Sequence, residues 1–345
     1  MKWALLVLFV MGCDTSRVDS INLTAEGMNF FKSGQTSKAI EAFRKAIELD
    51  PDNEKAHFRL GMIYNGALHD YLKAIEAFKK AVELDAETGE YWYYLGFAQS
   101  SQASKLLKER SMDEALRFME EARRSLEKAV ALDEYHAEAW LRLARLLMDL
   151  GEVSLAIDAY MNCIRANPVL RTEEVGGTAV AYLELGMLYE EYSFLDEALQ
   201  VLSNGIANNP EDIRLEAELG NVFLEMKRYT EAVPHFERAY LLREETGAPV
   251  ELVLPALYGQ GMAYAELGNQ AMRSRDVPES LKQMQSAKHW LALFVANVSG
   301  DAVAQRNAAQ AQLSDVETAL RALEEGQLPQ YILDQAEMNA PKDEK

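Results

Sequence analysis

One segment recurs almost unchanged along this sequence, and the distance between its copies limits the possible folds more than any other feature. Residues 39–50 return nearly residue for residue at residues 74–85. A third copy spans residues 122–133, where Leu126 replaces the phenylalanine, and a fourth begins at Ala232. Each copy places alanine and large apolar residues at helical spacing. A helix that returns with a period near 34 residues predicts a stack of similar units.

A second pattern, a small residue followed by an aromatic one, precedes most of these copies. It occurs at Gly27 with Phe30, Gly61 with Tyr64, Gly186 with Tyr189, Gly220 with Phe223 and Gly261 with Tyr264. Glycine lets a second helix approach closely, and the aromatic ring fills the groove beside it. We therefore expect pairs of helices, with Phe43, Phe78 and Phe236 between one pair and the next. Neither helix of a pair could bury its apolar stripe alone.

The second helix of a pair is expected to end at Asp50-Pro51, Asn167-Pro168 and Asn209-Pro210, because proline lacks an N–H and disfavours helix in the residue before it. These small-residue, aromatic and proline positions together resemble the tetratricopeptide repeat (TPR) family. The fourth unit shows the match well, at Trp140, Leu143, Ala144, Leu147, Gly151, Ala156, Tyr160 and Pro168. The resemblance implies an all-α fold, a TPR-type α-solenoid of about seven helix-turn-helix units with a C-terminal capping helix.

The units are irregular in length. They are expected to start near Ile21, Glu54, Gly89, Ala137, Ala179, Ile213 and Leu254, so that the solenoid spans residues 21–299. About 14 extra residues between Gly96 and Ala122 predict elongated helices in the third unit. Residues 170–178 predict a loop, and the seventh unit has extra residues at 269–279 before a helix from Pro278 to about Val298. Residues 300–325 are predicted to be the capping helix, and residues 326–345 a flexible acidic tail whose segment 331–333 could dock back.

The first thirteen residues have the layout of a secretory signal. Lys2 is followed by nine apolar residues and then Gly12-Cys13. Nine helical residues rise roughly 14 Å, too short to cross a hydrocarbon core of roughly 30 Å. Residues 10–13 resemble the bacterial lipobox, although Met11 departs from it. The resemblance implies a signal peptide at 1–12, lipidation of Cys13, a tether at 13–20 and a periplasm-facing protein on the inner or outer membrane. The alternative is an ordinary signal, or a start called too far downstream, with a chance cysteine.

Charge argues against one class of partner. The net charge is −20, and an acidic chain repels phosphate backbones, so we expect no nucleic acid. Such acidity can simply solvate the surface of an elongated body. The sharper interpretation is a preference for basic partners.

Nothing in the sequence assembles an active site, so we expect no enzyme, no cofactor and no metal. The five histidines lie far apart and have no metal-ligand spacing. His57 and His235 fall on repeat helices, where a packing role is expected. Cys163 occupies a small core position and is interpreted as a buried hydrophobe. Carboxylate pairs such as Glu190-Glu191 are interpreted as solvated helix faces.

In TPR proteins the first helix of each unit usually lines the binding surface. The repeat frame assigns an apolar, Met-rich groove to Met28, Phe31, Phe58, Met62, Tyr93, Phe97, Leu141, Met148, Leu183, Met187, Leu224, Tyr258 and Met262. Phe58 and Met62 occupy the centre of what some relatives use as a carboxylate clamp, which argues against that mode. A methionine and aromatic lining suits an amphipathic helix or an extended apolar peptide. The alternative is that these side chains only fill the interior.

The sequence therefore predicts a non-enzymatic interaction scaffold, lipid-anchored in the bacterial envelope. The nearest resemblance is to TPR lipoproteins that support assembly of a pilus, secretion or outer-membrane complex. The alternative is an adaptor that recruits peptidoglycan-modifying enzymes.

Overall fold

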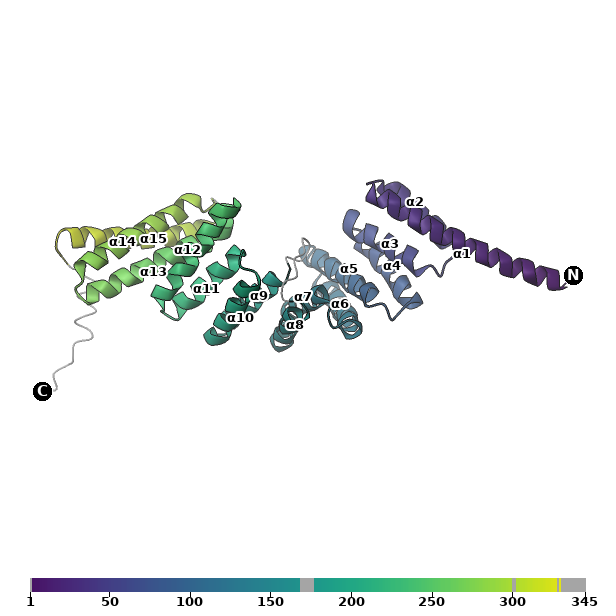
Figure 1. Cartoon of the computed structure of the whole chain (residues 1–345), viewed down its shortest axis with the longest axis horizontal. Helices are drawn as coiled ribbons and strands as arrows, with labels where there is room; N and C mark the ends of the chain where they lie inside the picture. Colours follow the sequence, from purple (N-terminus) through teal and green to yellow (C-terminus); the bar gives the residue numbers. More distant parts are fainter. Residues whose placement is uncertain (1, 168–176, 300–301, 328, 330–345) are drawn as a thin grey trace. The chain divides into compact units, whose positions relative to one another are not determined.

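The computed structural model describes residues 2–167, 177–299, 302–327 and 329. Within them every regular element is a helix (Figure 1). The chain divides into two compact units, unit 1 at Met1–Leu170 and unit 2 at Arg171–Lys345. The predicted loop at 170–178 falls almost wholly outside the described residues, and so does most of the tail from 326 onward.

Unit 1 contains four pairs of α-helices and one short π-helix. Its elements are α1 (Lys2–Lys32), α2 (Thr36–Leu49), α3 (Glu54–Met62), η1 (Ile63–Ala67), α4 (Tyr71–Leu84), α5 (Gly89–Lys108), α6 (Met112–Leu132), α7 (Ala137–Asp149) and α8 (Val153–Ala166). Among the described residues, no helix of either unit is long and apolar enough to cross a membrane.

Unit 2 contains three further pairs and a last helix. Its elements are α9 (Gly177–Glu191), α10 (Leu195–Asn208), α11 (Ile213–Glu225), α12 (Tyr229–Thr246), η2 (Val250–Val253), α13 (Leu254–Arg273), α14 (Val277–Asn297) and α15 (Val303–Glu324). The fifteen α-helices of the described chain pack as pairs, with α15 against α14. The predicted all-α fold of helix-turn-helix units is confirmed, and the helix at the position expected for the cap is α15.

Six of the seven predicted unit starts agree closely with the helices, whereas the first, Ile21, lies inside α1, which begins at Lys2. Helices α3, α5, α7, α11 and α13 begin at the predicted residues, and α9 begins two residues before Ala179. The elongated third unit is present as α5 and α6, with a turn at residues 109–111 that the sequence did not predict. Residues 13–20, assigned to a tether, lie within α1.

A close approach between the two helices of a pair explains the recurring glycines. A Cβ atom placed on Gly61 would lie 2.7 Å from the Phe78 ring, and one on Gly220 would lie 2.5 Å from the Phe236 ring. Contacts this short do not occur, so any larger residue would push the helices apart. Phe236 also lies against Gly259 of the next pair. This ring therefore packs between two pairs, as the sequence predicted.

Polar contacts join the first pair to the second. Asn53 caps α3 by accepting a hydrogen bond from Ala56 N, and its Nδ2 donates to Ser20 Oγ at 2.7 Å and to Thr24 Oγ1 at 3.0 Å. Ser20 in turn donates to the carbonyl of Ala46, at the end of α2. Ser20 and Thr24 are buried. This network fixes α1 from residue 20 onward against both α2 and α3.

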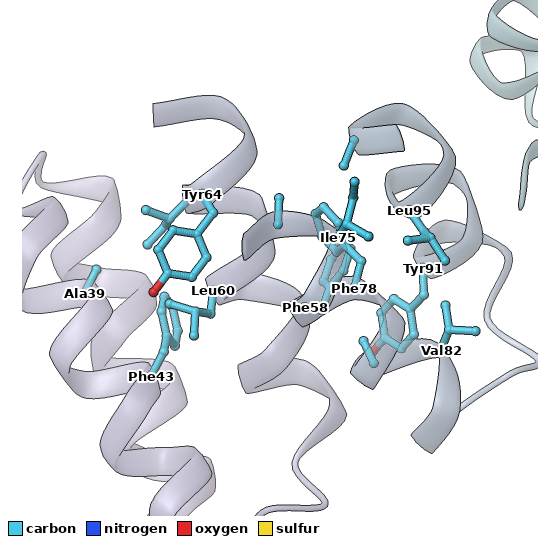
Figure 2. Close-up of a cluster of buried hydrophobic side chains, with 14 residues drawn as sticks. Ala39, Phe43, Phe58, Leu60, Tyr64, Ile75, Phe78, Val82, Tyr91 and Leu95 are labelled. Atoms are coloured by element: carbon cyan, nitrogen blue, oxygen red, sulfur yellow. The ribbon is translucent and has the colours of Figure 1, made fainter. Parts of the chain in front are cut away.

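The core of unit 1 runs through successive pairs (Figure 2). Phe43 and Phe78, from the second helices α2 and α4, lie among Phe58, Leu60 and Tyr91 of the first helices. Side chains from one pair thus fill the space left by its neighbour, which is what a pair needs because it cannot bury its apolar stripe alone. A separate cluster around Met284, Leu291 and Leu320 joins α13, α14 and α15.

Candidate binding face

The first helices of neighbouring pairs lie beside one another within each unit. Helix α11 contacts α9 and α13, α5 contacts α7, and α1 contacts α3. Their exposed sides form what we call the first-helix face of unit 1 and the first-helix face of unit 2. All thirteen predicted groove residues lie on these helices.

Burial separates the predicted groove residues into three groups. Phe31 and Met187 are 36% and 49% exposed. Half-buried are Met28, Met62, Phe97, Met148, Leu183, Leu224, Tyr258 and Met262. Phe58, Tyr93 and Leu141 are each only 2% exposed. The prediction that these three line an open groove is therefore wrong, because they belong to the core.

The contacts of Phe58 show why the repeat pattern gave the wrong exposure for these three residues. Its ring lies 4.7 Å from the Tyr91 ring, 5.3 Å from Tyr94 and 5.7 Å from Phe78, measured between centroids. The Arg59 guanidinium lies 5.2 Å from the centre of the same ring. The next helix pair therefore covers the side of the Phe58 ring that the repeat pattern alone would leave exposed.

The first-helix face of unit 1 carries an arginine that the sequence analysis missed. The Arg142 guanidinium lies 3.5 Å from the centre of the Phe97 ring, and its Nε donates to the Tyr93 hydroxyl at 2.9 Å. The Tyr93 hydroxyl also lies 3.3 Å from Glu138 Oε2. Burial raises the pKa of Tyr93 to about 12, so the hydroxyl stays protonated at neutral pH. Arg142 is thus held by two aromatic residues of the preceding pair.

A cavity of about 110 Å³ opens beside this arginine. Its lining comes from α5, α6 and α7 and consists of Ser100, Ala103, Ser104, Leu107, Met119, Arg142, Arg145, Leu146 and Asp149. Burial raises the pKa of Asp149. Helix α5 supplies four of these residues, and three of them, Ala103, Ser104 and Leu107, lie in its extra length, so the insertion in the third unit helps to build the cavity.

The first-helix face of unit 2 has a different chemistry. Met187 is exposed and Leu183 and Leu224 are half-buried. Beside them Glu190 and Glu218 lie on α9 and α11, which contact each other, and Asn221 Nδ2 donates to Glu218 Oε2 at 3.2 Å. Burial, followed by Glu218 and then Glu225, raises the pKa of Glu190 to about 9. Glu190 was interpreted as part of a solvated pair with Glu191. That interpretation holds for the exposed Glu191 and is wrong for Glu190.

The two faces carry opposite charges at the same repeat position. Leu143-Ala144 in α7 and Leu219-Gly220 in α11 are equivalent in the frame, so Arg142 corresponds to Glu218. Arg145 likewise corresponds to Asn221 and Asp149 to Glu225. Comparing these equivalent positions would have revealed the difference from the sequence alone.

Two further cavities lie away from these clusters. One of about 310 Å³ is lined by Met262, Met284 and Val316 with polar residues of α13 and α15. Another of about 790 Å³ lies between α2, α3 and α4, where Leu60, Tyr64 and Ala77 are surrounded by lysines and glutamates.

The histidine and cysteine predictions can be compared with their surroundings. His235 lies 2.8 Å from Glu216 and stacks on Phe223, and His57 hydrogen bonds with the Pro51 carbonyl. Cys163 is 1% exposed. These contacts are structural, as predicted. The described part of the chain contains no group of three or more His, Cys, Asp or Glu side chains placed to hold a metal ion.

The chain is similar to several solved structures. The C-terminal part of a TPR repeat-containing protein from Cytophaga hutchinsonii is 16% identical, covers 76% of this chain and 93% of its own, and superposes with a TM-score of 0.53. Pseudomonas aeruginosa pilF is 18% identical over 70% of this chain and 96% of its own, with a TM-score of 0.47. MamA is 27% identical over 53% of this chain and 94% of its own, with a TM-score of 0.44. No curated protein matches the chain.

Family models match the chain directly. A model described as TPR repeat matches residues 27–66, and two described as tetratricopeptide repeat match residues 54–88 and residues 114–168 and 183–249. These segments together include more than half of the residues. They also contain the glycine and aromatic positions that pack against each other in α3 with α4 and in α11 with α12. The chain therefore belongs to the tetratricopeptide repeat family.

Proposed function

We propose that this protein is a non-enzymatic scaffold that holds segments of other proteins on its first-helix faces. The observation that carries the proposal is the exposure of large apolar side chains there. Met187 is 49% exposed and Phe31 is 36% exposed, with half-buried methionines and leucines nearby. Apolar side chains that gather on one face commonly mark an interaction surface, and methionine adapts to partners of different shape.

We further propose that the scaffold is lipid-anchored through Cys13 in the bacterial envelope, where it supports assembly of a pilus, secretion or outer-membrane complex. The support is the resemblance of residues 10–13 to the lipobox. In a bacterial host, Cys13→Ser should move the protein from the membrane to the soluble fraction. Cys163→Ser, which alters the buried cysteine, is the matched control. Unchanged membrane partition of Cys13→Ser would remove the anchor from the proposal.

Partner identity can be tested by cross-linking in intact membranes followed by mass spectrometry. Pilin, secretin or outer-membrane assembly proteins should be recovered with the full chain, whereas murein hydrolases or synthases would favour the peptidoglycan adaptor. Recovery should fall with Met187→Ser and persist with Leu241→Ser, which changes an exposed side chain on the second helix α12. If neither variant changes recovery, the first-helix face of unit 2 is not the contact.

A further inference from the structure

The first-helix face of unit 1 presents an arginine that its neighbours hold in place. The Arg142 guanidinium stacks on the Phe97 ring, and its Nε donates to the Tyr93 hydroxyl. Glu138, one turn before Arg142 on α7, hydrogen bonds with the same hydroxyl. Within the described chain, Arg142 is thus linked to an acid through Tyr93, and no Asp or Glu forms an ion pair with it.

These contacts leave the two Nη groups of Arg142 without an acceptor among the described residues. A guanidinium carries five N–H donors, and the bond to Tyr93 uses the one on Nε. Its planar fork matches the two oxygens of a carboxylate. Stacking on Phe97 covers a face of the guanidinium and not this donor edge. Because the ring and the hydroxyl already hold the side chain, little rotamer entropy remains to be lost on binding.

The cavity beside Arg142 provides room for one anionic group. Its volume is about 110 Å³, and its charged lining consists of Arg142, Arg145 and Asp149. Two cations against one acid give the lining an excess of positive charge, in a chain whose net charge is −20. Pockets for drug-sized ligands begin at roughly 300 Å³. The cavity therefore suits the head group of a single side chain.

Positive charge at this repeat position is confined to unit 1. Arg59 holds the position of Arg142 in α3, and its guanidinium also lies beside an aromatic ring, that of Phe58. In unit 2 the same position carries Glu184 in α9 and Glu218 in α11. An anionic group of a partner would therefore be attracted on unit 1 at a position where unit 2 repels it.

We propose that the first-helix face of unit 1 binds a segment of a partner protein through one aspartate or glutamate, whose carboxylate enters the cavity and pairs with the Nη groups of Arg142. The inference rests on the proposed scaffold function and names the chemistry of its partner. It is the reverse of what the net charge alone favours, because the local lining and not the whole chain faces the bound group.

The surroundings of the cavity favour an internal side chain over a chain end. The α5 part of the lining extends from Ser100 to Leu107, which is 38% exposed, and the half-buried Phe97 lies one turn before Ser100. A segment that covers both Phe97 and Leu107 must continue past the carboxylate in both directions. A nucleic-acid phosphate is disfavoured as the anion, because a chain with a net charge of −20 repels a polyanionic backbone.

Peptide binding to the full chain tests this inference. The probe is a fluorescein-labelled, C-terminally amidated peptide with one central glutamate between leucines, and its counterpart has glutamine in place of the glutamate. We expect the glutamate peptide to bind about tenfold more tightly, because a charge pair at a partly desolvated interface contributes on that order. Arg142→Gln should abolish this preference, and Arg142→Lys, which keeps the charge without the fork, should retain part of it. Circular dichroism confirms that each variant is folded.

Arg117→Gln is the matched control. Arg117 also lies beside an aromatic ring, 5.6 Å from the centre of Phe118, but on the second helix α6. Its replacement should change the affinity for the glutamate peptide less than about twofold, because exposed charges away from an interface contribute little. Equal affinity of the two peptides for the unchanged chain, or equal losses in Arg142→Gln and Arg117→Gln, would overturn the proposal.

Two further peptides identify the occupant. The glutamine peptide with a free C-terminal carboxylate would assign the site to a chain end if it bound as tightly as the glutamate peptide. A peptide of residues 330–345 that did so would assign the site to this chain's own tail. Either result overturns the proposal. Cross-linked partners recovered equally with Arg142→Gln and with the unchanged chain would also overturn it, and would leave the scaffold function standing.

Discussion

Equivalent repeat positions on the first-helix faces of the two units carry different side chains with different exposure. In unit 1 the aromatic residues at the frame positions are largely withdrawn into the core, and an arginine is stacked on the remaining ring. In unit 2 the corresponding residues of α9 and α11 are leucine and methionine, and Glu190 and Glu218 lie on the same two helices. The repeat pattern fixes where a first-helix side chain lies along the array. Its exposure depends on the size of the residues in the neighbouring pair.

The largest expected change in the free energy of unfolding comes from truncating the more buried of two residues at equivalent repeat positions. Phe58 in α3 and Leu183 in α9 occupy the same frame position. Phe58→Ala should reduce the free energy of unfolding by about 3–5 kcal/mol because it leaves a cavity among aromatic rings, whereas Leu183→Ala should cost about 1 kcal/mol. Urea denaturation, with hydrogen exchange to locate the loss, measures both. Similar losses at the two sites would show that the faces do not differ in burial.

The comparison also defines what could be predicted before the structure. Helix pairing and most unit starts follow from glycine and alanine positions, because a close helix contact excludes other residues. Met187 and Phe31 are exposed and Leu183 is half-buried, and their role in a groove stays a prediction. Phe58, Tyr93 and Leu141 could not be distinguished from them, because burial depends on side chains contributed by other helices, as Phe78, Tyr91 and Tyr94 cover Phe58. The pKa of Glu190 is raised first by burial and then by Glu218 and Glu225 of α11, 28 or more residues away in sequence, and the local sequence Glu190-Glu191 does not show either effect.

Reversing the equivalent charges should have opposite effects in the two units. Arg142→Glu removes a hydrogen bond to Tyr93 and the contact with Phe97, and should cost about 1–2 kcal/mol of unfolding free energy. Glu218→Arg gives Glu190 an opposite charge and should stabilise the protein by up to about 1 kcal/mol. Thermal unfolding at low salt measures both. Destabilisation by Glu218→Arg would show that the carboxyl contact supports the fold.

The titration of Glu190 makes the stability of unit 2 depend on pH. Its pKa is about 9 in the folded protein, against an ordinary 4.5. The folded state therefore keeps a proton that the unfolded state releases, and stability falls as pH rises from about 4.5 to about 9. Glu190→Gln should raise the melting temperature more at pH 8 than at pH 5. The exposed Glu191→Gln should show no such difference, and a gain independent of pH for Glu190→Gln would contradict the assignment.

The smallest effect on stability is expected at the most exposed predicted contact. Met187→Ser should change the free energy of unfolding by less than about 0.5 kcal/mol, because little surface is buried there in the free protein. Its effect on the recovery of cross-linked partners should be larger, since a bound partner would cover this side chain. Cross-linking recovery measured beside chemical denaturation separates the two quantities. A stability loss as large as that of Leu183→Ala would place Met187 in the core.

The contacts of Ser20 and Thr24 with Asn53 have a mechanical consequence. If Cys13 is attached to a membrane, Ser20 is the first buried side chain of α1 within residues 15–32, and it lies seven residues or about 10 Å further along the helix. Tension applied at the anchor would travel along helical hydrogen bonds to a buried polar junction shared by α1, α2 and α3. A force on the attached end would then act directly on the second helix pair, because few residues lie between the anchor and the junction that could extend first.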